Sequence, residues 1–328
     1  MTGEFDIIAK YFAPLAADFS GAFDLGDDAA SLPAQASVIT KDLLVEGVHF
    51  RSKDPRSSVA KKALRVNLSD LAAKGARPIG YFLGCVWPLG VKEETIAEFA
   101  AGLREDQDHY KIALMGGDTT AQIVKGAPFT ISITMIGTQG SAGMIRRSGA
   151  AQGDDVYVSG TIGDAGLGLA ALSGGVKFSA AHKAALTARY QLPAPRVSLG
   201  GAIGGHASAS IDVSDGLIAD AGHIAYQSKA AIDLYAEKIP LSEAAQSWLS
   251  KAPEADAAIA QIASFGDDYE ILFTAPASRR RSIEMASQVT KTPVARIGAV
   301  GRGKGVRLLN AKGAEIPVPR AGFDHFKA

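Results

Sequence analysis

The sequence has little of what would mark a secreted, membrane-bound or nucleic-acid-binding protein. It contains one cysteine, Cys85, which excludes an internal disulfide framework and any cysteine-rich metal site. Lys and Arg together number 34, as do Asp and Glu, so the formal net charge is zero and nothing draws the whole chain to nucleic acid or anionic membranes. No apolar run reaches the length of about 18 residues that a membrane span needs, and the N-terminus does not read as a signal peptide. We therefore expect a cytoplasmic protein.

The composition is that of a globular protein with room for two domains. The chain has 328 residues, of which 47% are hydrophobic and 21% charged. Its 36 glycines are many for this length, and several follow strand-like runs beside Asp, Ser or Thr. Backbone can approach a ligand closely at such positions, so we expect a binding site at the ends of strands.

Helical and strand-like patterns alternate through the first part of the chain. The expected elements are a helix over 4–12, strands over 37–42 and 79–87, helices over 57–74 and 92–111, a strand over 112–115 that runs into Gly116, Gly117 and Asp118, and a strand over 129–137. Between 138 and 153 the composition changes to Gly, Ser, Arg and Gln. We place the boundary in this stretch, which gives domains 1–146 and 147–328.

The second part of the chain repeats the alternation. The expected elements are strands over 156–159, 209–213, 269–274 and 295–300, a glycine-rich entry to a helix over 162–172, and helices over 214–227 and 278–289. The sequence therefore predicts two α/β domains with mixed sheets.

Asp70 is the most informative acid in the first half. On the expected helix over 57–74, positions 59, 63, 66, 70 and 73 share one face and read Val, Ala, Val, Asp, Ala. A carboxylate within an apolar stripe needs a cation or several hydrogen-bond donors, and Asn67 lies on the neighbouring row. We favour a metal ligand. A different helix register, or an aspartate satisfied by backbone amides, is the alternative.

Further aspartates fall at or near the ends of expected strands, where α/β sheets place ligands. They are Asp27, Asp42, Asp118, Asp212 and Asp215, with Thr40 on the same strand face as Asp42. Taken singly, Asp118 also fits a turn, and Asp215 also fits a helix start that Ser214 would cap. As a group of oxygen ligands without cysteine they suit Mg²⁺, and several Mg²⁺ ions in one cleft suggest a polyphosphate substrate.

Common nucleotide and hydrolase motifs are missing. The sequence has no G-x-x-x-x-G-K-[ST] loop and no Ser/His/Asp signature, and SGTIGDAGLG (159–168) has the wrong glycine spacing for a dinucleotide loop. The residues alone favour a nucleotide-using enzyme whose Mg²⁺–carboxylate cluster comes from both halves of the chain. A nucleotide- or Ca²⁺-binding module without catalysis stays open.

Eight segments of the sequence carry a family resemblance. They are LGDDAA (25–30), ITKDLLVEGVHF (39–50), NLSDLAAKGARP (67–78), LMGGDTT (114–120), RRSGAAQGD (146–154), SIDVSDGL (210–217), FGDDYE (265–270) and GFDHF (322–326). In their order and spacing they resemble the thiamine-monophosphate kinase family nearly end to end. EGVHF and GFDHF are the more diagnostic, whereas GDDAA and SDGL are shared more widely across the AIR-synthetase-like (PurM-like) superfamily. AIR synthetase is the runner-up enzyme.

The resemblance implies transfer of the ATP γ-phosphoryl group to thiamine monophosphate by a direct in-line step with several Mg²⁺ ions. Donor and acceptor are both anions, and a phosphate oxygen has no proton to lose, so no catalytic base is assigned. The implied α/β (α+β) fold has two domains. An N-terminal mixed sheet pairs in a homodimer, and a C-terminal α/β domain completes the substrate site. No nucleic-acid or membrane partner is implied.

The resemblance also implies roles for single residues. The metal ligands would be Asp27, Thr40, Asp42, Asp70, Asp118, Asp212 and Asp215; the ATP contacts Tyr110, Gly117, Asp118, Arg147 and Ser214; and the substrate contacts His49, Glu270 and Phe323. An aromatic face at Phe323, where many relatives have Trp, suits the thiazolium or pyrimidine ring. Many relatives also have Thr or Ser where this chain has Lys41. We interpret Asp220 and His223 as an ordinary interhelix contact.

The GDD spelling occurs three times with different expected roles. The first, at 26–28, indicates a metal site with Asp27 as the stronger ligand, and the second, at 153–155, indicates a turn. The third, at 266–268, supplies Glu270 two residues later.

Overall fold

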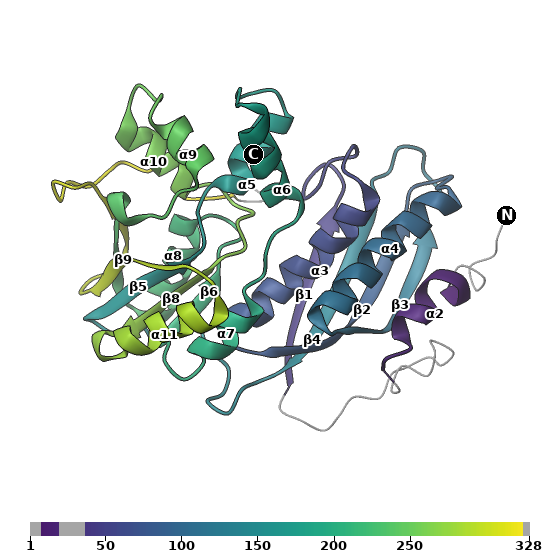
Figure 1. Cartoon of the computed structure of the whole chain (residues 1–328), viewed down its shortest axis with the longest axis horizontal. Helices are drawn as coiled ribbons and strands as arrows, with labels where there is room; N and C mark the ends of the chain where they lie inside the picture. The colour runs from purple at the N-terminus through teal and green to yellow at the C-terminus, as the bar shows by residue number, and fades with distance from the viewer. Residues whose placement is uncertain (1–7, 20–36, 324–328) are drawn as a thin grey trace. The chain divides into compact units, whose positions relative to one another are not determined.

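A computed structural model describes residues 8–19 and 37–323, and its first sheet has the strand order β1-β4-β2-β3 (Figure 1). β1 (Ser37–Val45) and β2 (Arg77–Trp87) each pair antiparallel with β4 (Thr130–Thr138), and β3 (Ala113–Ala121) pairs parallel with β2. β4 reads TISITMIGT, and its alternation of β-branched residues buries every second side chain over its first six residues. The predicted mixed sheet in this half is confirmed.

Two long helices of the first unit lie side by side over this sheet (Figure 1). They are α3 (Arg56–Ala73) and α4 (Glu93–Tyr110). They approach closely because residue 102 of α4 is glycine, where a Cβ would overlap the Ser57 backbone of α3. The helix predicted over 4–12 is instead a π-helical turn over Ile8–Phe12 followed by α2 (Ala13–Ala16), and residues 4–7 lie outside the described residues.

The strand predicted over 112–115 is longer than expected. β3 continues through Gly116, Gly117 and Asp118 because its whole length pairs with β2 as far as Trp87. Asp118 therefore lies within a strand and does not follow one. The register shifts once, between Tyr81 and Phe82 of β2, which marks a bulge in this pair.

The second sheet has six strands in the order β10-β7-β9-β5-β8-β6. These strands are β5 (Asp154–Ser159), β6 (Ala209–Asp212), β7 (Ala231–Tyr235), β8 (Ile271–Pro276), β9 (Val294–Gly301) and β10 (Gly305–Leu309). Neighbouring strands are antiparallel except β10 and β7. Every residue of β5 is buried, as expected for a strand inside a sheet that is covered on both faces.

Two apolar clusters cover the two faces of the second sheet. The helical elements around it are α5 (Asp164–Leu172), α6 (Ala180–Gln191), α7 (Val197–Ile203), α8 (Leu217–Ser228), η3 (Ala236–Lys238), α9 (Glu243–Leu249), α10 (Ala255–Ala263), η4 (Ala277–Arg279) and α11 (Arg280–Thr290). Val156 and Val158 of β5 point into the cluster that includes α8 and α10, whereas Tyr157 points into the cluster that includes α7 and α11. Period-two alternation thus builds a layered α/β unit.

The chain divides into two compact units, residues 1–71 with 77–139 and residues 72–76 with 140–328. Residues 72–76 belong to the second unit because Ile145 N donates to Lys74 O at 3.1 Å and Gly200 packs on the Ala72 carbonyl. The division falls at 139/140, and the predicted domain boundary lies at 146/147. None of the described helices is long and apolar enough to cross a membrane.

Candidate active site

In the first unit, β1 and α3 bring together three of the predicted metal ligands. Thr40 and Asp42 lie on one face of β1, and Thr40 Oγ1 donates a hydrogen bond to Asp70 Oδ2 on α3. Burial and the negative charge of Asp70 raise the pKa of Asp42 to about 7. Two neighbouring carboxylates beside a hydroxyl form an oxygen donor set that fits Mg²⁺.

Lys41 lies on the opposite face of β1 from these ligands, since successive side chains of a strand alternate. Its Nζ donates to Ser132 Oγ on β4 at 2.5 Å. A lysine at this position therefore takes no hydroxyl away from the face that carries Thr40 and Asp42.

The segment that carries His49 is fixed by two hydrogen bonds. Val45 N donates to His49 Nδ1 at 3.0 Å, and the Nζ of the buried Lys62 donates to His49 O at 2.9 Å. A backbone N–H only donates, so Nδ1 accepts and the hydrogen of the neutral imidazole is on Nε2. The predicted substrate contact is thus held in one tautomer. Sequence reasoning missed Lys62, although a lysine one helical turn from both Val59 and Val66 was a signal.

Tyr110, Gly117 and Asp118 lie elsewhere in the first unit. Gly117 and Asp118 are exposed on β3, and β4 and β2 separate this edge strand from β1. Gly117 is required there because a Cβ would overlap the carbonyl of Leu83. Tyr110 is the last residue of α4, and its ring centroid lies 5.8 Å from the guanidinium carbon of Arg65.

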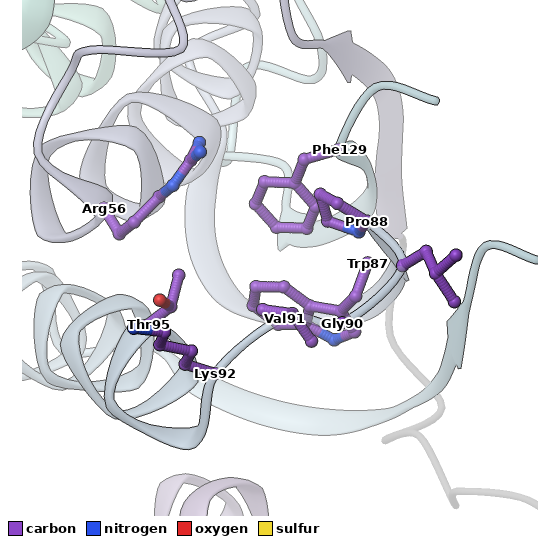
Figure 2. Close-up of a pocket in the computed structure, with 9 residues that line it drawn as sticks. Arg56, Trp87, Pro88, Gly90, Val91, Lys92, Thr95 and Phe129 are labelled. Atoms are coloured by element: carbon purple, nitrogen blue, oxygen red, sulfur yellow. The ribbon is translucent and has the colours of Figure 1, made fainter. Parts of the chain in front are cut away.

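A cavity of about 300 Å³ also lies in this unit, at the starts of α3 and α4 (Figure 2). The stacked rings of Trp87 and Phe129, 4.3 Å apart, line it together with Arg56 and Lys92. Arg56 Nη1 is buried, and no group in the described part of the chain accepts a hydrogen bond from it. None of the predicted site residues in the described part of the chain lines this cavity, so we give it no part in the site.

In the second unit, two predicted residues meet beyond the end of β6. Asp212 is the last residue of this strand and is 5% exposed. Three residues later, Asp215 O accepts a hydrogen bond from Phe323 N at 2.9 Å. The structure therefore places the predicted aromatic substrate contact directly beside a predicted metal ligand.

The 265–270 segment runs alongside the residues that follow β6. Val213 N donates to Glu270 O, and Tyr269 N donates to Val213 O, each at 2.8 Å. Asp267 and Tyr269 have φ of 70° and 51°, in the left-handed region that few residues other than glycine adopt. Strained backbone of this kind clusters at functional sites and supports a site at this end of the sheet.

The helix predicted to begin at Ser214 starts at Leu217. Gly216 precedes it with φ of 133°, and Ser214 and Asp215 form a loop before the helix, so the alternative in which Ser214 caps this helix was wrong. The loop is held by Asp220, whose Oδ2 accepts from the backbone N–H of Ser214, Asp215 and Gly216, each at 3.1 Å. Burial and the charge of Asp215 raise the pKa of Asp220 to about 7.

Asp220 therefore positions a loop, which corrects its interpretation as an ordinary interhelix contact. Its carboxylate and ligand atoms of Asp215 and His223 lie within 4.8 Å of one another. The spacing of Asp220 four residues after Gly216 was the signal, because a carboxylate at that distance reaches the free amides of a helix start.

Glu270 is completely buried, and other side chains surround its carboxylate. Arg196 donates through Nε to Oε2 at 2.7 Å and through Nη2 to Oε1 at 2.6 Å. Arg189 Nη2 donates to Oε1 at 2.8 Å, and Ser159 Oγ donates to Oε2 at 2.6 Å. Sequence reasoning missed both arginines, which lie 74 and 81 residues away along the chain.

Two predicted residues remain, Arg147 and Asp27. The side chain of Arg147 is exposed, and its backbone carbonyl accepts from Ser228 Oγ at 3.3 Å. Asp27 lies outside the described residues.

Comparison with known proteins decides the family. Residues 26–139 match the family described as AIR synthase related protein, N-terminal domain. The thiamine-monophosphate kinase of Caulobacter vibrioides is 42% identical over 325 residues, which cover 98% of this chain and 90% of that protein. The chain belongs to the thiamine-monophosphate kinase family. The resemblance seen in the eight sequence segments is thereby confirmed.

Solved structures of thiamine-monophosphate kinases share the fold along the chain. The enzyme from Stenotrophomonas maltophilia K279a matches with a TM-score of 0.78 and 39% identity, over 86% of this chain and 89% of that one. AaThiL complexed with AMPPCP and TMP matches with a TM-score of 0.77 and 30% identity, over 99% and 97%. The predicted two-domain α/β fold is confirmed.

Proposed function

We propose that the chain transfers the γ-phosphoryl group of ATP to the phosphate of thiamine monophosphate, giving thiamine diphosphate and ADP. The observation that carries this proposal is the identity of 42% to a thiamine-monophosphate kinase over 98% of the chain. The complex of a relative with an ATP analogue and TMP supports the same two ligands here.

The reaction needs positive charge held beside the phosphate oxygens, and it needs no catalytic base. An oxygen of the acceptor phosphate attacks the γ-phosphorus, and the bond from that phosphorus to the β,γ-bridging oxygen breaks, which leaves ADP. We propose that several Mg²⁺ ions are held by Asp27, Thr40, Asp42, Asp70, Asp118, Asp212 and Asp215. When bound, they would neutralise the phosphate oxygens of both substrates.

The remaining roles follow from the same proposal. The binding site for ATP consists of Tyr110, Gly117, Asp118, Arg147 and Ser214. The binding site for thiamine monophosphate includes His49, Glu270 and Phe323. The position of Phe323 beside Asp215 supports an aromatic contact near the metal ligands. The Nε2–H of His49 supports a hydrogen bond to an acceptor atom of the substrate.

The product assay tests the function. The protein, MgCl₂, ATP and thiamine monophosphate are incubated together, and the thiamine species and nucleotides are separated. We expect thiamine diphosphate and ADP in equal amounts. ADP without thiamine diphosphate would overturn the proposal. No product at any time, with ATP bound in calorimetry, would favour a nucleotide-binding module, and turnover of formylglycinamidine ribonucleotide would favour AIR synthetase.

An Asp42→Asn variant tests the metal site. Turnover should be lost, while the melting temperature of the metal-free protein stays the same or rises, because Asp42 and Asp70 repel each other without a cation. A large fall in the metal-free melting temperature would instead make Asp42 a structural residue.

We also propose that the chain forms a homodimer in the cytoplasm. Ile39 and Leu43 are 61% and 53% exposed on β1, an edge strand, and such apolar side chains suit a pairing of sheets. Light scattering on the eluting protein measures the mass of the assembly, and Leu43→Glu should shift it to the monomer.

A further inference from the structure

Two arginines meet one buried glutamate at the end of β5 in the second unit. Arg189 lies in the last turn of α6, Arg196 directly precedes α7, and Glu270 precedes β8. The arginine side chains are 21% and 22% exposed, whereas Glu270 is 0% exposed. The carboxylate therefore lies beneath two arginine side chains that are themselves partly exposed.

The carboxylate of Glu270 has no acceptor capacity left. A carboxylate offers about four lone-pair sites. Arg196 takes two of them as a fork, and Arg189 and Ser159 take one each. A substrate donor would have to displace one of these groups, so Glu270 is built to hold the arginines.

Gly160 packs directly against the Glu270 carboxylate. Its φ is 58°, and a Cβ at this position would overlap the Glu270 carboxylate. Only glycine satisfies both conditions without moving the carboxylate from beneath the arginines.

Two guanidinium groups share the single carboxylate of Glu270. Asp268 also contacts this cluster, because its backbone O accepts from Arg189 Nη2 at 3.3 Å. Burial raises the pKa of the Asp268 carboxyl to about 8, so this group is mostly neutral at neutral pH and does not balance the arginines.

Arg189 also has an unused donor. Its Nε is buried, and no acceptor in the described ranges 8–19 and 37–323 pairs with it. A buried N–H without a partner is costly, and an anionic oxygen would satisfy it. Guanidinium groups bind phosphate oxygens through two parallel N–H donors. The cluster also adjoins the proposed metal site, since Glu270 O accepts from Val213, the residue after Asp212.

We propose that Arg189 and Arg196 form a phosphate-binding pair, and that Glu270 is a positioning residue that acts through them. The inference deepens the proposed function and rests on it for the choice of ligands. Two sources of a phosphate group are present in that reaction, the acceptor thiamine monophosphate and the nucleotide. The alternative is an ion-pair network that only ties α6 and α7 to the sheet.

Calorimetry on the full chain at fixed salt compares thiamine, thiamine monophosphate and AMPPCP. Thiamine lacks the phosphate, so the ratio of its Kd to that of thiamine monophosphate isolates the phosphate contact. In Arg189→Gln we expect the affinity for one phosphate ligand to fall about tenfold or more, with thiamine unchanged. Loss for thiamine monophosphate identifies the acceptor as the source, and loss for AMPPCP identifies the nucleotide.

Three further variants separate this role from a structural one. Arg189→Lys keeps the positive charge but lacks the paired N–H donors of a guanidinium group, so it should lose less affinity than Arg189→Gln. Glu270→Gln should weaken binding of the same phosphate ligand as Arg189→Gln. Arg280→Gln removes an arginine that pairs with Asp155 in the same unit and should leave all three affinities unchanged. If Arg189→Gln does not fold, Arg189→Lys still reports the ratio.

Two results would overturn the inference while wild-type turnover is normal. One is an unchanged affinity for both thiamine monophosphate and AMPPCP in the folded Arg189 variants, and the other is an equal loss of affinity for thiamine and thiamine monophosphate. Absence of turnover in the wild type is a separate failure, that of the proposed function, and the AMPPCP arm then still tests the arginine pair.

Discussion

β5 has a carboxylate between two arginines at each of its ends, and the two clusters differ in burial. At its start, Asp155 pairs with Arg280 through bonds of 2.6 and 2.9 Å and with Arg296 at 3.3 Å. Those arginine side chains are 55% and 45% exposed. The Glu270 cluster at its other end has the same composition, with arginines about half as exposed.

The comparison shows that environment decides what an ion pair can do. An exposed ion pair is screened by water and contributes about 0–1 kcal/mol to the free energy of unfolding. The Asp155 cluster therefore mainly links side chains at the start of β5. Around a carboxylate with no exposure, each arginine is fixed and partly desolvated, which strengthens its attraction to an anion. We therefore assign ligand binding to the Glu270 end and only stability to the Asp155 end.

The largest contrast should come from neutralising each carboxylate. Glu270→Gln leaves two partly buried guanidinium groups facing each other, and loss of one partner in a buried pair costs about 3–5 kcal/mol. Asp155→Asn should cost about 1 kcal/mol, since water solvates its arginines. Urea unfolding of the full chain, followed by circular dichroism, measures both. Equal losses would remove the distinction between the two ends.

Glycines flank β5 on both sides and give the next contrast. Gly153 has φ of 91° with nothing within 4 Å of a Cβ, whereas the Cβ of residue 160 would overlap Glu270. Gly153→Ala should cost about 1–2 kcal/mol from backbone strain alone. Gly160→Ala should cost roughly twice that and should also weaken phosphate binding, because the carboxylate must move. A similar cost without any loss of binding would detach Gly160 from the arginine pair.

The dependence of stability on pH should have opposite signs at the two ends. Burial raises the folded pKa of Asp268 to about 8 from its ordinary 3.8, so the folded state holds this proton longer, and stability falls as the pH rises from about 4 to about 8. The hydrogen bonds from Arg280 lower the pKa of Asp155, so its contribution is full above about 4 and is lost as the pH falls further.

Melting temperatures of Asp268→Asn and Asp155→Asn across this pH range measure both effects. The first variant should flatten the loss of stability above pH about 4, and the second should flatten the loss in acid. A parallel shift of either curve, with its slope unchanged, would show that the carboxyl concerned does not titrate as described.

The smallest effect is expected for Arg296→Gln. Its contact with Asp155 is 3.3 Å long and its side chain is 45% exposed, so the cost should stay below about 0.5 kcal/mol and vanish in 1 M salt. Arg196→Gln, measured in the same way, should keep its cost in salt.

The local sequence pattern predicted the helices and strands, but it did not predict contacts between residues that are far apart in the sequence. The alternation in β4 and the helical spacing of α3 were visible because period is a property of neighbouring residues. Asp118 was placed after a strand because two glycines suggest a turn, while pairing with β2 keeps the strand going. The arginines around Glu270 come from distant segments, and no spacing in one sequence brings them together.

The family resemblance and the structure add to each other at the candidate site. The sequence marked Asp42, Asp70, Asp212 and Asp215 as ligands, and the structure brings the first two together and places Phe323 beside the last. Residues that hold ligands in place, such as Asp220, were harder to find, because their signal is a contact with the main chain.

The loop of Ser214, Asp215 and Gly216 has a kinetic consequence. One oxygen of Asp220 accepts all three of its amide hydrogens, so no amide of the loop can leave without disturbing the other two. In hydrogen–deuterium exchange the three should therefore become labelled at one common rate, set by a single opening event. The three-residue segment that carries Asp215 is thus expected to open and close as one cooperative unit.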